Sequence, residues 1–377
     1  MKPTEVPDER LRILHVILVL RSTNSQYNEH SLPVMHERDI SLCSYFVPQL
    51  TPPRGIRVFP GDGTLRGFFR ALRDALAAGP YDAVHAHSPQ AGVFLILAMI
   101  RRPRSGLHRQ MVLTVHDSFY DFKIRNKLLL IPAFAIFRSV VFCSHAAYES
   151  LPRLLTLVVG QRARVVQNGA DIGRVDQVIQ SLDVAANDVF TVISIGRLEE
   201  VKDPLTALRA FALGAEPNSR MVFIGEGELR PELERAIAEN GLEDRVTLTG
   251  LIEREEVFRH LVGADVFLST SHGEGLPVAV MEAMACSVPL VLSDIPPHRE
   301  FKADAGIIAL VPPGDAEGFA GELARLQSMT RVDRASIGRA GRDLVATRFS
   351  LEHMNEGYEA IYRELRRVGP TAGDPRA

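Results

Sequence analysis

The sequence has few cysteines and no apolar run long enough to cross a membrane. Its three cysteines, Cys43, Cys143 and Cys286, are far apart and have apolar neighbours. This predicts reduced core residues, with neither a disulfide framework nor a zinc site. The longest apolar runs, such as residues 13–20, are far shorter than the ~20 residues of a membrane span. The N-terminus is polar and charged, unlike a signal peptide. We therefore expect a cytoplasmic protein, with peripheral contact at the inner face of a membrane as an option.

The chain also lacks a large net charge and a dinucleotide-binding glycine motif. The net charge is only −3, which argues against a nucleic-acid partner. No Gly-x-Gly-x-x-Gly follows the first apolar strand, which argues against a Rossmann dehydrogenase. The charge is uneven, however: residues 1–180 hold 22 Lys/Arg against 14 Asp/Glu, and the remainder holds 21 against 32. The basic half could contact an anionic membrane or acceptor, or it could simply be a solvated surface.

Short apolar segments alternate with helical patterns along the whole chain. This alternation predicts an α/β fold with parallel sheets, and the length of 377 residues favours two domains. We expect domains at 1–171 and 188–349, a linker at 172–187, and a last helix at 350–368. The predicted strands are 13–20, 41–47, 55–59, 81–87, 111–117, 139–144 and 163–167, then 190–196, 221–224, 246–249, 264–270, 289–293 and 307–311.

Residues 271–286 form the stretch on which the functional prediction centres. They follow an apolar strand and read as a glycine-containing loop that enters a helix near Pro277. Such a loop is an anion site, because backbone N–H groups point out of a helix start. Glu274 and Glu282 flank it, and carboxylates accept hydrogen bonds from neighbouring sugar hydroxyls. An ordinary loop with two solvent-facing glutamates is the alternative.

A second cluster of charged residues follows the strand at 190–196. Gly196 permits close backbone approach, and Arg197 and Lys202 could neutralise a diphosphate. Because the carboxyl ends of parallel strands meet at one edge of a sheet, we expect these cations near Glu274 and Glu282. Surface cations near a helix start are the alternative.

These segments resemble retaining glycosyltransferases of family 4. Glu274 and Glu282, with seven residues between them inside Ser-x-x-Glu-Gly-x-Pro, resemble that family's donor-site signature, and Gly-Arg-Leu-x-x-x-Lys at 196–202 resembles its diphosphate-binding signature. Asn168-Gly-Ala-Asp171 resembles the turn that ends the family's first domain. The resemblance implies the GT-B fold, two Rossmann-like domains with parallel sheets facing across a cleft.

The resemblance also implies roles for individual residues. Glu282 would hold the ribose and Glu274 the sugar, while Arg197 and Lys202 would stabilise the leaving diphosphate. Gly275, Leu276 and Pro277 would complete the donor loop. Backbone groups at Leu251 and Ile252 would contact the base. The catalytic set would be His116, Arg197, Lys202 and Glu274, with His116 contacting the donor sugar from the end of the strand at 111–117.

The acceptor would bind the first domain. The loop at 21–33 contains no glycine, which departs from the family pattern, so its polar residues Asn24 and Asn28 are acceptor candidates. A capped helix start is the equal alternative. His87 would line the cleft. His85 and His87 could be read as metal ligands, but no Cys or carboxylate completes a site.

The predicted activity is transfer of a sugar, with retention, from a nucleoside diphosphate sugar to an acceptor hydroxyl in glycolipid, polysaccharide or small-glycoside biosynthesis. The chain contains no Asp-x-Asp, so we expect neither a metal nor another cofactor. The alternatives are a GT-B nucleotide-sugar epimerase and a non-catalytic nucleotide-sugar-binding protein. The acceptor would be a sugar, a lipid-linked molecule or another small molecule.

Overall fold

The protein folds into two compact units, each built around one parallel β-sheet. The computed structural model describes residues 10–101, 106–182, 189–301 and 307–368. The first unit comprises residues up to Val166 together with those from Met354 onward, and the second comprises Gln167–His353. Each unit is described by itself.

The sheet of the first unit has seven parallel strands in the order β3-β2-β1-β4-β5-β6-β7. Its five inner strands are almost wholly buried, as expected when helices cover both faces of a parallel sheet, and the edge strands β3 and β7 are only partly buried. They are β1 Arg12–Ile17, β2 Asp39–Ser44, β3 Arg57–Pro60, β4 Ala83–Ala86, β5 Met111–Val115, β6 Ser139–Phe142 and β7 Ala163–Val165.

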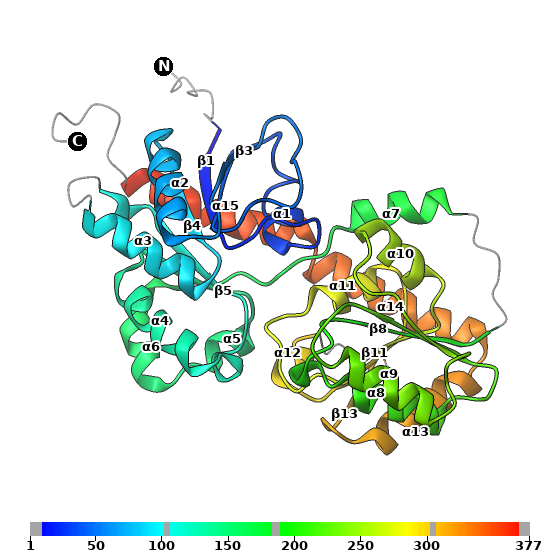
Figure 1. Cartoon of the computed structure of the whole chain (residues 1–377). Helices are drawn as coiled ribbons and strands as arrows, with labels where there is room; N and C mark the ends of the chain where they lie inside the picture. Colours follow the sequence, from blue (N-terminus) through cyan, green and yellow to red (C-terminus); the bar gives the residue numbers. More distant parts are fainter. Residues whose placement is uncertain (1–9, 102–105, 183–188, 302–306, 369–377) are drawn as a thin grey trace. The chain divides into compact units, whose positions relative to one another are not determined.

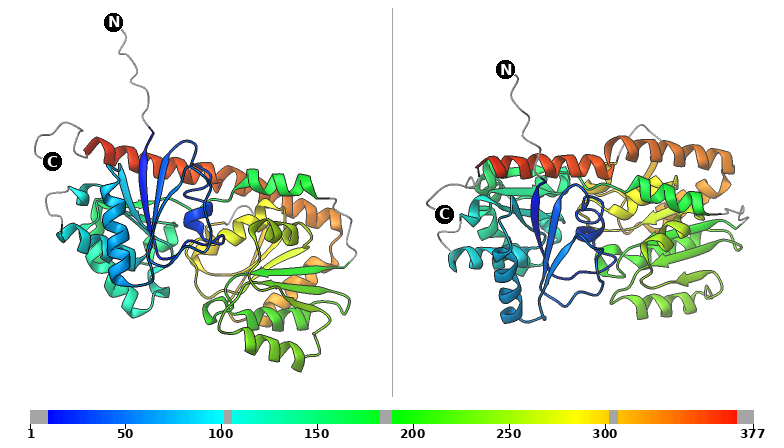
Figure 2. Two further views of the ribbon diagram at one scale, coloured as in Figure 1. Left: turned by 45° about the horizontal axis from the view of Figure 1, so that its top comes forward. Right: turned by 90° about the horizontal axis from the view of Figure 1, so that it is seen from above.

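Helices cover this first sheet on both sides. Right-handed crossovers place α2, α3, α4 and α6 on one face, where neighbours in this series pack together. The other face receives α15, shown in red in Figure 2, whose Tyr362 hydroxyl lies 2.7 Å from His85 Nδ1. The helices are α1 Ser25–Asn28, α2 Leu65–Ala77, α3 Pro89–Arg101, α4 Ile124–Ile136, α5 His145–Glu149, α6 Arg153–Val159 and α15 Leu351–Val368.

The sheet of the second unit has six parallel strands in the order β10-β9-β8-β11-β12-β13. Helices α8, α9 and α13 cover one face, and α7, α10, α11 and α14 cover the other (Figure 1). The strands are β8 Thr191–Ile195, β9 Arg220–Ile224, β10 Val246–Leu248, β11 Val266–Ser269, β12 Leu290–Ser293 and β13 Ile308–Val311. The helices are α7 Ile172–Ser181, α8 Pro204–Gly214, α9 Arg230–Glu239, α10 Arg254–Val262, α11 Val278–Ala285, α12 Pro296–Arg299, α13 Ala316–Ser328 and α14 Arg331–Arg348.

Two Rossmann-like parallel sheets confirm the predicted fold class. In each sheet the chain first winds outward in one direction and then returns to the centre to wind in the other. The reversal falls beside β1 in the first sheet and beside β8 in the second. Ligands of open α/β sheets bind at such a reversal, at the carboxyl ends of the strands.

The structure divides the chain slightly before the sequence prediction. The boundary falls after Val166, and residues 172–181 of the expected linker form helix α7 in the second unit. Asp171 caps this helix by accepting a hydrogen bond from the Arg174 backbone N–H at 2.9 Å. Val175 and Val178 bury its apolar side. Residues 183–187 of that linker lie outside the described residues.

None of the helices in the described ranges is both long enough and apolar enough to span a bilayer.

Candidate functional site

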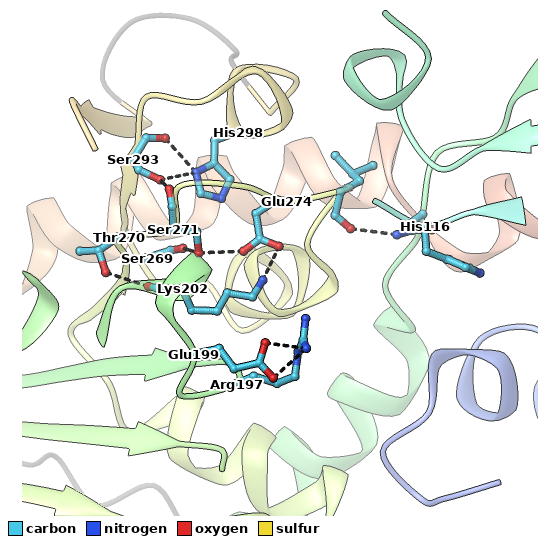
Figure 3. Close-up of polar contacts among 12 residues, drawn as sticks. His116, Arg197, Glu199, Lys202, Ser269, Thr270, Ser271, Glu274, Ser293 and His298 are labelled. Carbon is cyan, nitrogen blue, oxygen red and sulfur yellow. Dashed lines mark hydrogen bonds and ion pairs between the residues drawn. The ribbon is translucent and has the colours of Figure 1, made fainter. Parts of the chain in front are cut away.

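The site of the second unit forms where β8 and β11 end. The two strands pair in parallel, with Val192 opposite Val266, so their following loops leave the same edge of the sheet. Lys202 lies in the loop after β8, and Glu274 lies in the loop after β11. Lys202 Nζ lies 2.5 Å from Glu274 Oε2 (Figure 3). The predicted convergence of these two loops is therefore present.

The Glu274 carboxylate is buried but well supported. Ser271 Oγ donates a hydrogen bond to Glu274 Oε1 at 2.8 Å, and Lys202 binds the other oxygen. Burial alone would raise the pKa of Glu274, but the Lys202 charge and the hydrogen bonds from Lys202 and Ser271 outweigh it and hold the pKa below its usual value. The carboxylate is thus ionised at neutral pH and can accept hydrogen bonds from hydroxyl groups.

A buried histidine, His298, lies near Glu274, and the sequence pattern did not indicate it. His298 Nδ1 lies 2.8 Å from the Ser293 carbonyl oxygen, so this nitrogen carries the proton. Ser293 Oγ in turn donates to the Ser271 carbonyl at 2.5 Å. Burial lowers the pKa of His298, although the nearby Glu274 opposes the shift. The imidazole is therefore neutral, and no polar atom of the described chain lies within hydrogen-bonding distance of its buried Nε2.

Arg197 lies at the rim of this site. Its side chain is 64% exposed, and Nη1 donates to Glu199 Oε1 at 2.8 Å. A small hollow between the ends of β8 and β11 is lined by Gly196, Arg197 and Lys202 together with serines at 269 and 271. Among the described residues Arg197 pairs with the partly buried Glu199, and an exposed ion pair of this kind holds a side chain weakly. Two cations and several hydroxyl groups at one sheet edge suit an anionic, hydroxyl-bearing ligand.

The turn after β9 packs directly beneath the Arg197 loop. The Gly196 N–H donates to the Ile224 carbonyl at 3.0 Å, and the Leu198 N–H donates to the Glu226 carbonyl at 3.0 Å. A Cβ atom added to Gly227 would lie 2.2 Å from the Leu198 carbonyl oxygen, far closer than atoms can approach. Glycine is thus required here for contact between the two turns.

We expect Gly227→Ala to destabilise the second unit by about 1–3 kcal/mol, since overpacking forces the backbone to shift. The substitution should also lower the affinity for any ligand that the Arg197 loop binds. Chemical denaturation measures the first effect and calorimetry the second. Gly321→Ala is the control, because open space surrounds that helical position. Equal stability of the two variants would contradict the close packing of the turns.

Glu282 is buried on α11 and paired with an arginine that the sequence pattern did not indicate. Arg254, at the start of α10, forms an ion pair with Glu282 Oε1. Burial raises the pKa of Glu282, although Arg254 opposes the shift. Arg174 of α7 donates to Glu255 Oε1 at 2.6 Å and adds to the positive charge nearby. These ion pairs fix the orientation of the Glu282 side chain, the predicted ribose-binding group, within the second unit.

The remaining donor candidates occupy loops at the same edge. Gly275 and Leu276 are buried, and the Leu276 carbonyl accepts a hydrogen bond from Asn168 Nδ2 at 2.8 Å. Pro277 caps the N-terminus of α11, one position before the first helical turn. Residues 251–252 follow the end of β10, with Leu251 61% exposed and Ile252 partly buried.

The histidines of the first unit form a connected cluster at the ends of β1, β4 and β5. His87 Nδ1 lies 3.2 Å from His116 Nε2, and His87 Nε2 lies 2.8 Å from His15 Nδ1. The strand register places His15 directly beside His85. His15 thus adds a third imidazole to His85 and His87, the pair considered above as metal ligands. His85, however, uses both nitrogens, on Tyr362 and Thr114. We therefore interpret the cluster as a hydrogen-bonded core.

The polar loop at 21–33 supports its own helix start. Asn28 is buried, and its Nδ2 donates to the Ser22 carbonyl at 2.6 Å and to the Asn24 carbonyl at 3.0 Å. Asn24 Oδ1 accepts from the Arg21 backbone N–H at 2.9 Å. These bonds correspond to the capped-helix alternative, and they leave Asn24 the more accessible of the two acceptor candidates.

Two Rossmann-like units, with an ionised carboxylate beside cations at the edge of the second sheet, are features of the GT-B class of glycosyltransferases. The family described as Glycosyltransferase Family 4 matches residues 17–174, and the family described as Glycosyl transferases group 1 matches residues 181–344. The chain belongs to these glycosyltransferases, and its predicted family is confirmed.

Several relatives are glycosyltransferases of polysaccharide and glycolipid synthesis. The amylovoran biosynthesis glycosyltransferase AmsK of Erwinia amylovora is 34% identical over 195 residues, which is 49% of this chain and 45% of that protein. The UDP-Gal:alpha-D-GlcNAc-diphosphoundecaprenol alpha-1,3-galactosyltransferase of Escherichia coli is 26% identical over 314 residues, 79% of this chain and 78% of that protein.

Solved structures share the fold of the whole chain. Sucrose-phosphate synthase from Thermosynechococcus elongatus has a TM-score of 0.77 at 19% identity and covers 96% of this chain and 100% of that one. Anabaena HepE in complex with UDP and glucose has a TM-score of 0.75 at 19% identity, with 94% and 100% covered.

Proposed function

We propose that this glycosyltransferase moves a sugar from a nucleoside diphosphate sugar to a hydroxyl of a lipid-linked saccharide, with retention of configuration. The contact between Lys202 and Glu274 carries the proposal. It places a cation that can bind a diphosphate beside a carboxylate that can bind sugar hydroxyls, at one edge of the sheet. Relatives whose names include diphosphoundecaprenol and diphosphopolyprenol acceptors support the choice of acceptor. Structures of Anabaena HepE with UDP and UDP-glucose support the choice of donor.

The proposed reaction assigns one task to each group. Glu282 binds the ribose hydroxyls and Glu274 the sugar hydroxyls, while Lys202 and Arg197 stabilise the charge that grows on the leaving diphosphate. The bond from the anomeric carbon to the phosphate oxygen breaks, and a bond from that carbon to the acceptor oxygen forms on the same face. The acceptor proton passes to the departing phosphate oxygen. No divalent metal is needed in this scheme, because the two cations neutralise the diphosphate.

His116 and His298 complete the proposed scheme. His116 follows β5 in the first unit and is proposed to contact the donor sugar. Burial lowers the pKa of His116 to about 4, so it acts as a neutral hydrogen-bonding group. His298 is proposed to fix Glu274 from behind, since it lies near that carboxylate and is itself held by Ser293. His298→Asn should therefore weaken sugar binding more than nucleotide binding.

Calorimetry with UDP-, GDP- and ADP-sugars, first without metal and then with Mg²⁺, tests the donor site. We expect one nucleotide class to bind without metal, and Glu282→Ala to weaken it at least about tenfold, as loss of hydrogen bonds to a charged group implies. Leu213→Ser, an exposed change on α8, serves as the folded control. Absence of binding by the folded wild-type protein would refute the proposal.

Product analysis then separates transfer from epimerisation. A transferase consumes the donor at a useful rate only when an acceptor is added, and it releases nucleoside diphosphate. An isomeric nucleotide sugar formed without an acceptor would instead indicate an epimerase. Chromatography of the nucleotide products distinguishes these outcomes.

A further inference from the structure

Large exposed apolar side chains gather on one helical layer of the first unit. Among the described residues, fifteen large apolar side chains are exposed, and nine of these lie between residues 97 and 158. Three helices supply most of them, and α4 packs against both α3 and α6. We name this the α3/α4/α6 surface, whose main apolar members are Ile100, Ile124, Leu128, Ile131, Leu154 and Leu157.

The spacing of these residues shows that α4 has two apolar sides. On α4, Ile124, Leu128 and Ile131 recur at helical spacing and are 77%, 62% and 43% exposed. Leu130 and Phe134, on the opposite side of the same helix, are buried in the core. A helix that is apolar on both sides must meet a second apolar phase beyond its own domain core. Solvent alone does not explain the pattern.

The charge around this surface is mainly positive. From residue 90 to residue 170 the sequence contains eleven Lys/Arg and only three Asp/Glu. Lys123 and Arg125 are exposed on either side of Ile124, and Arg153 is exposed next to Leu154. The described parts of helices α3, α4 and α6 contain no acidic residue. Apolar side chains among cations suit an interface of acyl chains and anionic headgroups.

We propose that the α3/α4/α6 surface docks the protein onto an anionic lipid bilayer. The apolar side chains enter the boundary between headgroups and acyl chains, and the neighbouring cations bind the headgroups. The role of this docking rests on the proposed function, because a lipid-linked acceptor lies in such a bilayer. Docking would bring the acceptor-binding unit to the membrane.

The test is co-sedimentation of the full chain with phosphatidylcholine vesicles, with and without phosphatidylglycerol. We expect strong binding only to the anionic vesicles, and weaker binding as salt rises. Ile124→Ser/Leu128→Ser/Leu157→Ser should reduce partitioning at least about tenfold, because three apolar anchors are lost. Lys123→Gln/Arg125→Gln should reduce it about fivefold per cation on anionic vesicles alone.

Matched controls keep the test specific. Leu213→Ser/Val332→Ser removes equally exposed apolar groups from the second unit and should leave partitioning unchanged. Light scattering of the wild type and the triple variant reports whether the surface instead joins two copies of the chain. The proposal is overturned if the wild type binds anionic vesicles weakly, or if all variants bind them equally. It is also overturned if the wild type is a dimer and the triple variant a monomer.

Donor binding, measured on the same proteins, separates the two proposals. Loss of vesicle binding in the triple variant with unchanged nucleotide-sugar binding supports the docking surface. A wild-type protein that binds vesicles but no nucleotide sugar would refute the proposed function and leave the docking surface standing.

Discussion

Lys202→Met is expected to lower kcat/KM by about 10²–10³, the cost of removing one group that stabilises charge in a transition state. Lys202 is the partly buried cation of the site, and its Nζ contacts Glu274 at 2.5 Å. Methionine keeps much of the side-chain volume while removing the charge. Steady-state kinetics with the nucleotide sugar identified by calorimetry measure the loss.

Two further variants show whether Lys202 acts through charge or only by supporting Glu274. Arg197→Met removes an exposed cation that pairs with Glu199, so its effect should be smaller. The double variant Lys202→Met/Glu274→Gln should lose less than the product of the single losses, since the two groups contact each other. A folded Lys202→Met enzyme with nearly full kcat/KM would rule out the proposed role of Lys202.

The second large effect is acid destabilisation of the first unit. Burial lowers the pKa of His15 to about 3 and that of His116 to about 4. It also lowers the pKa of His30, His85 and His87 well below their usual value. Unfolded histidines take up protons below about pH 6.5, whereas these folded ones remain neutral. The unfolded state therefore binds more protons, and stability is lost as pH falls below about 6.5.

The expected size is about 1.3 kcal/mol for each such histidine between pH 7.5 and pH 5.5, from the linkage of proton binding to unfolding. Together the five would remove much of the ~5–15 kcal/mol stability of a typical domain. Denaturant unfolding at several pH values, followed by hydrogen exchange in each unit, measures this loss. The second unit should be affected less.

A histidine substitution isolates the cause. His30→Leu removes one buried imidazole, whose Nε2 has no hydrogen-bond partner within the described chain. The variant should show a shallower pH dependence, by about one histidine, whatever its stability at pH 7.5. His145→Gln, at an exposed position, should keep the wild-type slope. Equal slopes in all three proteins would contradict the role of the buried cluster.

The sequence by itself determined the elements and much of the donor site. Apolar strands alternating with amphipathic helices leave few solutions other than parallel sheets, because each strand must be covered on both faces. The loops after residues 195 and 269 had to reach one sheet edge once their strands paired. This is why the sequence alone predicts that Lys202 and Glu274 lie close together, as they do in the structure.

Only the tertiary structure decided which partners hold those residues. Arg254 pairs with Glu282 and His298 lies near Glu274 because helices and strands distant in sequence pack side by side. The register of β1 against β4 put His15 beside His85, and α15 closed the cluster with its tyrosines. Burial then set the protonation of these groups, since desolvation depends on packing in three dimensions and no local sequence pattern encodes it.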